Sequence, residues 1–309
     1  KEEEKETTAS LIRGVLAKLH KAGYPVAGFD MYVTSTVLPG SGLSSSAACE
    51  VLIGTTGNHL FCQDKFDAVE IAKIGQAAEN EYFGKPCGLM DQTASSVGDA
   101  VAIDFKDPAN PIVRSINADL TGLGLALCII DCGADHAALT NEYASIPEEM
   151  SKVAAHFGKK VLREVKEEDL LADLAQVRKE AGDRAVLRAL HFYADDRRAA
   201  EEADALERKD KEAFLNLVKE SGRSSWELLQ NITPAAAITH QDMAVALAVA
   251  EKALNGKGAC RVHGGGFAGT IQAFVPVEDV CEFKKTMETM LSEGCCHVLS
   301  IRPAGGLIL

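Results

Sequence analysis

The segment Pro39–Glu50, which reads PGSGLSSSAACE, constrains the fold of this chain more than any other segment. Gly40 and Gly42 permit backbone angles that a side chain would forbid, so the chain can turn tightly there. The serines of 44–46 can cap the apolar helix that the next residues predict. A glycine turn that leads into a helix N-terminus favours phosphate, because it gathers N–H groups and the positive end of the helix dipole. The segment also fits an ordinary capped connection, and it lacks the Gly-Lys-Ser/Thr of a Walker loop.

Length, composition and charge limit the possible functions. The chain has 309 residues, enough for two domains, and its 47% hydrophobic and 25% charged residues are typical of a globular protein. A net charge of −13 argues against nucleic acid or a membrane surface as a partner. An acidic protein that binds phosphates needs local donors or a metal ion, which favours dependence on a divalent cation.

Cysteine usage and the first residues indicate the compartment. The nine cysteines are an odd number, are irregularly spaced and include no C-x-x-C pair, so we expect reduced thiols and a cytoplasmic protein. The opening KEEEKE is unlike a cleavable signal peptide. The chain begins without methionine, so we expect that part of the protein precedes it.

Hydrophobic periodicity predicts strands interleaved with helices, without the steady alternation of a doubly wound sheet, and hence an α+β fold. The predicted domains are 1–121 and 122–309. The predicted strands are Gly28–Leu38, Val101–Phe105, Leu123–Asp131, one on each side of the glycine loop within Gly256–Pro276, and His297–Arg302. The predicted helices, besides the one after the opening loop, are Thr7–Ala22, Lys65–Phe83, Pro147–Phe157, Glu167–Ala181, Asp183–Lys209, Lys211–Ser221, Thr239–Leu254 and Val280–Glu293.

Polar and glycine residues elsewhere add candidate site residues. Asp91 lies in an apolar segment, so we expect a partly buried carboxylate that acts as a base or orients a hydroxyl, or else caps a helix. Glu79 is either a surface carboxylate or, with a hydroxyl and phosphates, a ligand for Mg²⁺. His136 and Tyr143 can hydrogen-bond a polyol or cap a loop. We expect Trp226 in the core.

A second glycine-rich loop lies far downstream, at Arg261–Thr270 (RVHGGGFAGT). Four glycines in six residues leave little side chain, which lets the backbone approach a ligand or another loop, although a glycine-rich hairpin explains the pattern equally well. These four glycines are Gly264, Gly265, Gly266 and Gly269.

Three motifs, taken in this order, resemble those of the GHMP small-molecule kinases and, within them, the galactokinases. They are PGSGLSSSAACE, EYFGKPCGLMDQTASSVG and VHGGGFAGTIQAF, and the helical stretch Ala185–Glu227 adds to the resemblance, which covers nearly the whole chain. CGLMDQ points to the galactokinases more narrowly than the glycine loops do. The resemblance implies an S5-like N-terminal domain, truncated at its start, and a ferredoxin-like, helix-rich C-terminal domain.

The same resemblance implies an ATP- and Mg²⁺-dependent kinase for the anomeric hydroxyl of galactose, acting as a monomer. Asp91 is then the catalytic carboxylate, Ser46 and Glu79 hold Mg²⁺, and Gly88 and Tyr143 contact the sugar. The ATP phosphates are held by Gly40, Ser41, Gly42, Leu43, Ser44, Ser45 and Ser46. The downstream loop, here named the third glycine motif (Gly264–Gly269), backs the phosphate loop.

The chain also departs from the family pattern. The family's opening segment, with a catalytic Arg and most sugar contacts, has no counterpart here, so we expect this chain alone to be inactive. No Trp stands near Thr8 to hold adenine, the usual Tyr-Asn-x-Arg-Arg is replaced by 143–147 (YASIP), and Ala268 replaces a Gly. Three alternatives remain at this point: a GHMP kinase for another sugar or small alcohol, a galactose and ATP sensor without turnover, and an inert domain that merely retains the fold.

Overall fold

A computed structural model describes residues 2–37, 43–133, 139–267 and 269–309. These form two compact units, 1–118 with 301–309, and 119–300. The last nine residues belong to the first unit, whereas the sequence division placed them with the second. They are held there by backbone hydrogen bonds, from Asp99 N–H to the Arg302 carbonyl (2.7 Å) and from Gly306 N–H to the Ser96 carbonyl (3.2 Å). The domain ranges 1–121 and 122–309 stay a prediction.

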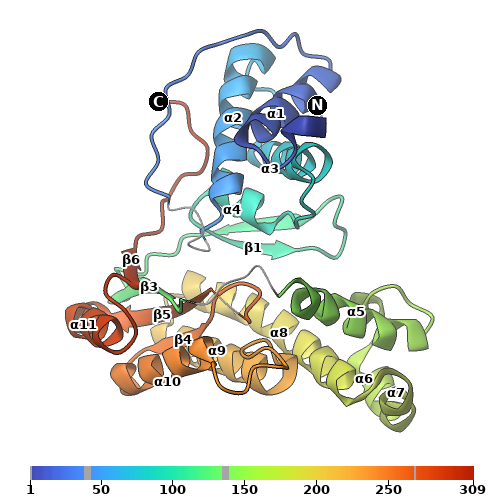
Figure 1. Cartoon of the computed structure of the whole chain (residues 1–309), viewed down its shortest axis with the longest axis vertical. Helices are drawn as coiled ribbons and strands as arrows, with labels where there is room; N and C mark the ends of the chain where they lie inside the picture. The colour runs from blue at the N-terminus through green and yellow to red at the C-terminus, as the bar shows by residue number, and fades with distance from the viewer. Residues whose placement is uncertain (1, 38–42, 134–138, 268) are drawn as a thin grey trace. The chain divides into compact units, whose positions relative to one another are not determined.

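The first unit is mainly helical (Figure 1). Thr7 begins α1 by accepting a hydrogen bond from the N–H of Ser10, and Asp67 and Glu70 form a reciprocal capping box at the start of α3. Val15, Ile53 and Ala78 are buried together where α1, α2 and α3 meet. The elements are α1 (Thr8–Lys21), α2 (Ser45–Cys62), α3 (Ala68–Ala78), the π-helical turn η2 (Glu79–Phe83), α4 (Met90–Val97), β1 (Ala100–Asp104) and β2 (Ile112–Ile116), with a 3-10 turn at Glu2–Glu4.

The strand predicted over Gly28–Leu38 is wrong for the part that the structure describes, because residues 28–37 form no regular secondary structure. A strand needs a neighbour for its backbone groups. In the described chain, β1 pairs only with β2, and the other sheet lies in the second unit. The segment therefore stays open to solvent, and Tyr32 is 92% exposed.

The second unit is built on an antiparallel sheet in the order β4-β5-β3-β6, which confirms the α+β class. β3 (Leu125–Asp131) lies between β5 (Thr270–Pro276) and β6 (Cys296–Leu299), and β4 (Ala259–Val262) is the edge strand. Cys128 faces Ala273 across the β3–β5 pair. The buried β3 agrees with its nearly continuous apolar sequence.

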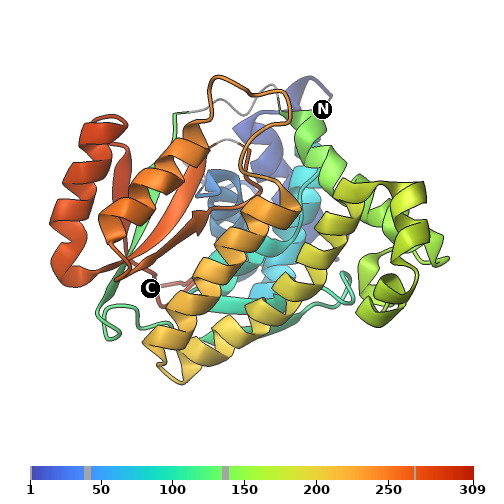
Figure 2. The same ribbon diagram turned by 90° about the horizontal axis from the view of Figure 1, so that it is seen from below.

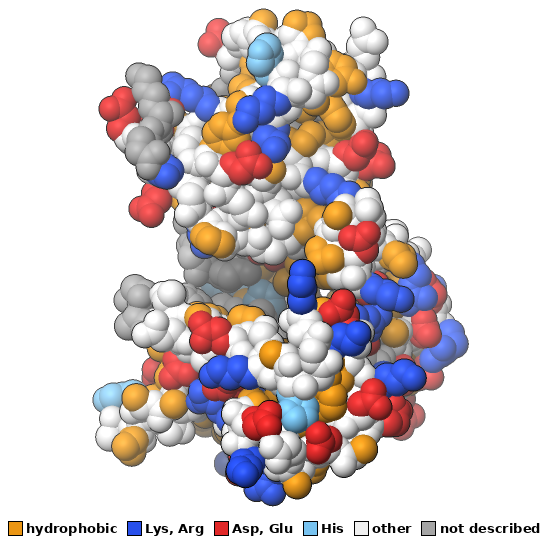
Figure 3. Space-filling model, turned by 90° about the vertical axis from the view of Figure 1, so that its right-hand side faces the viewer, with side chains coloured by type: hydrophobic (Ala, Val, Ile, Leu, Met, Phe, Trp, Pro, Cys, Tyr) orange, Lys and Arg blue, Asp and Glu red, His pale blue; other side chains and the backbone are white. Residues whose placement is uncertain are grey.

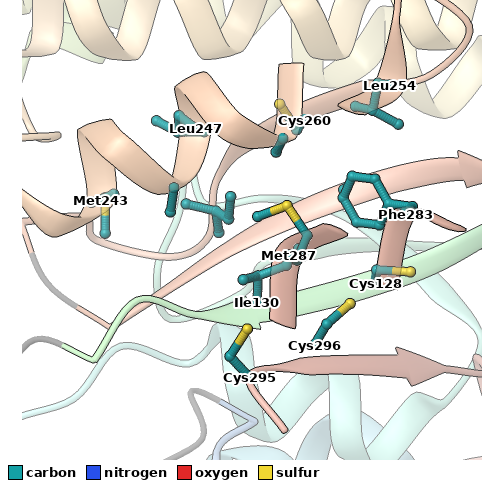
Figure 4. Close-up of a cluster of buried hydrophobic side chains, with 14 of the residues drawn as sticks. Cys128, Ile130, Met243, Leu247, Leu254, Cys260, Phe283, Met287, Cys295 and Cys296 are labelled. Atoms are coloured by element: carbon teal, nitrogen blue, oxygen red, sulfur yellow. The ribbon is translucent and has the colours of Figure 1, made fainter. Parts of the chain in front are cut away.

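Two helices, α10 (Asp242–Leu254) and α11 (Val280–Met290), contribute to the hydrophobic core of the sheet. Figure 4 shows Met243 and Leu247 of α10 and Phe283 and Met287 of α11 lying close to Ile130, Cys128 and Cys296 of the sheet. Sheet and helices thus enclose one apolar layer, which supports the strands that flank the third glycine motif.

Helices dominate the rest of the second unit. The long α8 (Asp183–Glu207) and α9 (Lys211–Ser224) run side by side (Figure 2). α5 (Thr140–His156), α7 (Leu174–Ala181) and α8 share a second core, which includes Val153, Val177 and Ala189. The remaining elements are the 3-10 turns η3 (Leu162–Glu164) and η5 (Val277–Asp279), α6 (Glu167–Ala172) and the π-helical turn η4 (Ser225–Leu229).

Trp226 does not lie in the core as expected, since it is 42% exposed. It lies on η4, where the neighbouring Ser225 takes the buried position instead. On the face drawn in Figure 3, basic and acidic side chains of the described residues are interspersed. None of the helices in the described ranges combines the length and the apolar composition of a membrane span.

Candidate active site

The described part of the opening segment begins at Leu43, because residues 38–42 lie outside the described residues. The roles of Gly40, Ser41 and Gly42 therefore stay predictions. α2 begins at Ser45, as the serine run predicts, but the capping hydrogen bond expected of the serine before it is absent among the described residues. Ser44 has φ +52°, in the left-handed region, and its hydroxyl is used elsewhere.

The Ser44 hydroxyl donates a hydrogen bond to Oδ2 of Asp91, at 2.5 Å. Asp91 lies in the first turn of α4, where a carboxylate interacts favourably with the helix dipole. Asp91 is exposed, which corrects the expectation of a partly buried carboxylate. The buried position of this turn is taken instead by Gln92, whose side chain points into the unit. The candidate base is thus open to a substrate and joined to the end of the phosphate loop.

Glu79 begins the π-helical turn that follows α3, and it is only 3% exposed, so it is not a surface carboxylate. The Gln92 amide nitrogen donates to Oε2 of Glu79 at 2.9 Å. The adjacent Cys87 thiol has its pKa raised to about 12, by burial first and then by its hydrogen bond to Glu79. The turn therefore brings a carboxyl group into the interior beside α4.

Glu50 is a further buried carboxylate, which the sequence interpretation did not single out. It is 1% exposed on α2, and the Gln92 amide nitrogen donates to its Oε2 at 3.0 Å. Burial, with the charge of Glu79 nearby, raises the pKa of Glu50 to about 7. The available signal was an acidic residue between Cys49 and Val51 in an otherwise apolar helix.

Ser46 and Glu79 offer a hydroxyl and a carboxylate oxygen, the kind of ligand that Mg²⁺ prefers. Ser46 lies in the first turn of α2. Within the described ranges, no cluster of three or more His, Cys, Asp or Glu residues could hold a metal ion by itself. A Mg²⁺ ion that is shared with nucleotide phosphates and water fits this sparse donor set, because Mg²⁺ keeps several ligands that are not from the protein.

Gly88 lies in the exposed connection between η2 and α4. The preceding residue, Cys87, fixes this connection, because its N–H donates to Asn80 Oδ1 at 2.7 Å and its carbonyl accepts from Gln76 Nε2 at 3.2 Å. These two hydrogen bonds hold the backbone just before Gly88, which itself lies three residues before Asp91 in the sequence. Its predicted contact with a sugar stays a prediction.

The third glycine motif belongs to the second unit, between β4 and β5. Gly266 has φ +83°, and a Cβ atom there would lie 2.1 Å from the carbonyl oxygen of Asn231. Asn231 also donates from Nδ2 to the Gly265 carbonyl at 3.1 Å. Only glycine fits this close approach. Ala268 lies outside the described residues, as does His136.

Tyr143, on α5, is joined to this motif. Its phenol donates to the Gly266 carbonyl at 2.7 Å, and its ring meets that of Phe267 edge to face, with centroids 5.5 Å apart. Burial raises the pKa of Tyr143, so the phenol stays protonated and able to donate. The predicted sugar contact of Tyr143 is not tested by these bonds, which instead give it a part in shaping the glycine motif.

The site residues therefore fall into two groups. In the first unit, Gln92 connects Glu50 with Glu79, and Ser44 connects the phosphate loop with Asp91. In the second unit, Tyr143 and Asn231 hold the third glycine motif.

Comparisons with known proteins identify the family. Residues 10–99 match the family described as "GHMP kinases N terminal domain". The galactokinase of Streptomyces coelicolor is 33% identical over 275 residues, which cover 89% of this chain and 68% of that protein. The galactokinase of Actinobacillus pleuropneumoniae serotype 3 is also 33% identical over 275 residues, covering 88% of this chain and 68% of the relative.

Solved structures agree on the fold. The crystal structure of Lactococcus lactis galactokinase complexed with galactose superposes with a TM-score of 0.77. The alignment covers 98% of this chain and 77% of that one, at 23% identity. The two-domain fold predicted from the three motifs is therefore confirmed as that of the GHMP kinases. With one third of its residues identical to those of curated relatives over most of its length, the chain belongs to the galactokinase family of the GHMP kinases.

Proposed function

We propose that the protein is an ATP-dependent galactokinase, which transfers the γ-phosphate of ATP to the anomeric hydroxyl of galactose and gives galactose 1-phosphate. Membership of the galactokinase family supports this reaction. Within the structure, the observation that carries the proposal is the hydrogen bond between Ser44 and Asp91, which ties an exposed carboxylate to the end of the phosphate loop.

Asp91 accepts the proton of the anomeric hydroxyl or orients that hydroxyl for attack on the γ-phosphorus. Because Ser44 binds Oδ2, we assign Oδ1 as the atom that faces the sugar. The attack forms the bond between the anomeric oxygen and phosphorus, and it breaks the bond to the β,γ-bridging oxygen, so that ADP leaves. Such a transfer depends mainly on positioning and on neutralising charge.

The N–H groups of 40–46 cradle the ATP phosphates at the start of α2, where the helix dipole favours negative charge. Ser46 and Glu79 hold the Mg²⁺ ion, which neutralises charge on the phosphates when it is bound. Gly88 and Tyr143 are the residues proposed to bind the sugar, and the third glycine motif keeps the supporting role that the resemblance implies. The start of α2 at Ser45 and the carboxylate and hydroxyl oxygens of Glu79 and Ser46 support the phosphate and metal roles.

We further propose that the protein acts as a monomer in the cytoplasm. All nine cysteines are free thiols, which suits a reducing compartment.

A coupled assay of ADP release by the full-length protein, with ATP and galactose, tests the proposed reaction. Parallel assays with other sugars and small alcohols test the substrate. Asp91→Ala is expected to lower kcat by about a hundred- to ten-thousand-fold, since that is the usual contribution of a positioned base. Asp30→Ala, at an exposed carboxylate outside the site, serves as the control. Near-normal turnover by a folded Asp91→Ala variant would refute the mechanism.

A further inference from the structure

One glutamine amide joins two buried carboxylates in the first unit. Glu50, Gln92 and Glu79, here named the amide cluster, come from α2, α4 and η2, and all three are at most 3% exposed. The Gln92 Nε2 atom lies 3.0 Å from Oε2 of Glu50 and 2.9 Å from Oε2 of Glu79. Since an amide nitrogen carries two hydrogens, it can serve one carboxylate with each.

The amide cluster is costly for the fold. Burying a carboxylate requires compensation by hydrogen bonds, yet Oε1 of Glu50 and Oε1 of Gln92 are buried and have no hydrogen-bond partner among the described residues. An apolar side chain of similar volume at position 50 would avoid this cost. The presence of Glu50 therefore points to a role other than stability.

The position of Glu50 on α2 suggests what that role is. Ser46 and Glu50 are four residues apart on one helix, so they share a face of α2. Glu50 is thus fixed rigidly relative to the hydroxyl assigned to Mg²⁺, while the other assigned ligand, Glu79, lies on a different segment. Gln92 connects the two segments through its amide.

We propose that Glu50 is a positioning residue for the metal carboxylate Glu79. By accepting one N–H of Gln92, Glu50 sets the orientation of the amide, and the second N–H then holds Oε2 of Glu79. Without Glu50 the amide is free to turn its oxygen towards Glu79, which repels the carboxylate and leaves it unoriented. The inference rests on the proposed function, because it takes Glu79 as a ligand of Mg²⁺.

A glycine on α3 makes room for this arrangement. A Cβ atom on Gly75 would lie 3.1 Å from Cβ and 3.2 Å from Oε2 of Glu50, tighter than ordinary contact, and 3.4 Å from Cγ of Gln92. Gly75→Ala therefore displaces Glu50 while it leaves all three members of the amide cluster chemically unchanged.

The test measures metal binding apart from turnover. Mn²⁺ is titrated into the full-length protein with the β,γ-imido analogue of ATP, and bound Mn²⁺ is measured by electron paramagnetic resonance. Glu50→Met, which keeps the length of the side chain but has no oxygen to accept from Gln92, is expected to raise the Mn²⁺ Kd about tenfold, as loss of an outer partner of a metal ligand does. Glu81→Gln, at an exposed carboxylate on the same π-helical turn, is the matched control and leaves the Kd unchanged.

A double-mutant cycle decides whether Glu50 acts through Glu79. In a Glu79→Gln background, Glu50→Met should have no further effect on the Mn²⁺ Kd. An equal loss in both backgrounds, or an unchanged Kd in folded Glu50→Met, overturns the inference. If Glu50→Met fails to fold, Gly75→Ala decides in its place, since weaker Mn²⁺ binding supports the inference and unchanged binding refutes it.

Release of ADP by the unaltered protein is measured in a separate experiment, which tests the proposed function and not the role of Glu50. If the unaltered protein releases no ADP with galactose, the proposed function fails. If it does release ADP while Glu50→Met binds Mn²⁺ normally, only the role of Glu50 fails.

Discussion

The Ser44 hydroxyl donates to Oδ2 of Asp91 at 2.5 Å, although the two residues are 47 positions apart in the sequence. Ser44 holds a left-handed backbone conformation at the point where α2 begins, so its side chain turns towards α4 instead of capping its own helix. The phosphate loop and the candidate base are thereby joined through side chains within one unit.

Ser44→Gly should lower kcat for galactose phosphorylation about tenfold, which corresponds to the low end of the contribution of a hydrogen bond to a charged group. Glycine tolerates φ +52°, so the change removes the hydroxyl without straining the backbone. The KM for ATP should stay the same, because the N–H group at this position is retained. Steady-state kinetics of the full-length protein measure both quantities, and a rise in the KM for ATP with unchanged kcat would contradict the assigned role.

Gly266→Ala should lower the free energy of unfolding by about 2 kcal/mol or more, since a strained backbone conformation costs about 1 to 3 kcal/mol and a clash with the Asn231 carbonyl is added here. Gly264→Ala is the matched control. Gly264 also has a positive φ, of +64°, but a Cβ atom there meets no atom within 4 Å. Denaturant unfolding compares the two variants, and equal losses would show that the contact with Asn231 is unimportant.

Arg188→Met should destabilise the protein by about 1 to 3 kcal/mol, because it leaves buried acceptors such as the Leu229 carbonyl without their donor, while Glu149 keeps its pair with Arg184. Arg188 is completely buried and donates to Glu149 Oε2 and to Ser145 Oγ, both at 2.9 Å. Arg178→Met, which removes an exposed pair with Asp183, should cost much less. Urea titrations measure both, and similar small losses would refute the importance of the buried pair.

His156 should make stability depend on pH. Hydrogen bonds to Glu180 (2.7 Å) and Asp173 (2.8 Å) raise its pKa, so the folded state holds the proton more tightly than the unfolded state does. This contribution is fully present below the ordinary histidine pKa of about 6.5, provided that the carboxylates remain ionised, and it is lost as the pH rises through the raised pKa. The difference in Tm between the unaltered protein and His156→Gln should therefore be largest near pH 6 and shrink towards pH 9. A difference that grows with pH would show the opposite linkage.

Much of the fold could be predicted from hydrophobic periodicity, as α8 and β3 show, since in each the pattern matches the burial. Three features could not be predicted in this way: the irregular segment 28–37, the π-helical turns and the exposure of Trp226. The alternating pattern of 28–37 indicates a strand, but a strand also requires a partner, and the described chain supplies none. The π-helical turns η2 and η4 have no distinct sequence pattern, and η4 exposes Trp226.

In the candidate site, too, local motifs could be predicted from the sequence but tertiary contacts could not. The local motif at 39–50 predicts where α2 begins, and the order of the three motifs identifies the family. The partners of the site residues depend on tertiary contacts, so the link from Ser44 to Asp91 and the burial of Glu50 emerge only from the structure. An acidic residue in an apolar helix was the one available signal for Glu50.

Asp91 and Gln92 are neighbours in the first turn of α4, one exposed and bonded to Ser44, the other buried and bonded to two carboxylates. A shift or rotation of this turn moves both side chains together. Attempts to engineer the enzyme for another acceptor by repositioning Asp91 should therefore also disturb the proposed metal carboxylate Glu79. Substitutions at Tyr143, the proposed sugar-binding residue on α5, leave this turn unchanged and offer the more independent route to a new specificity.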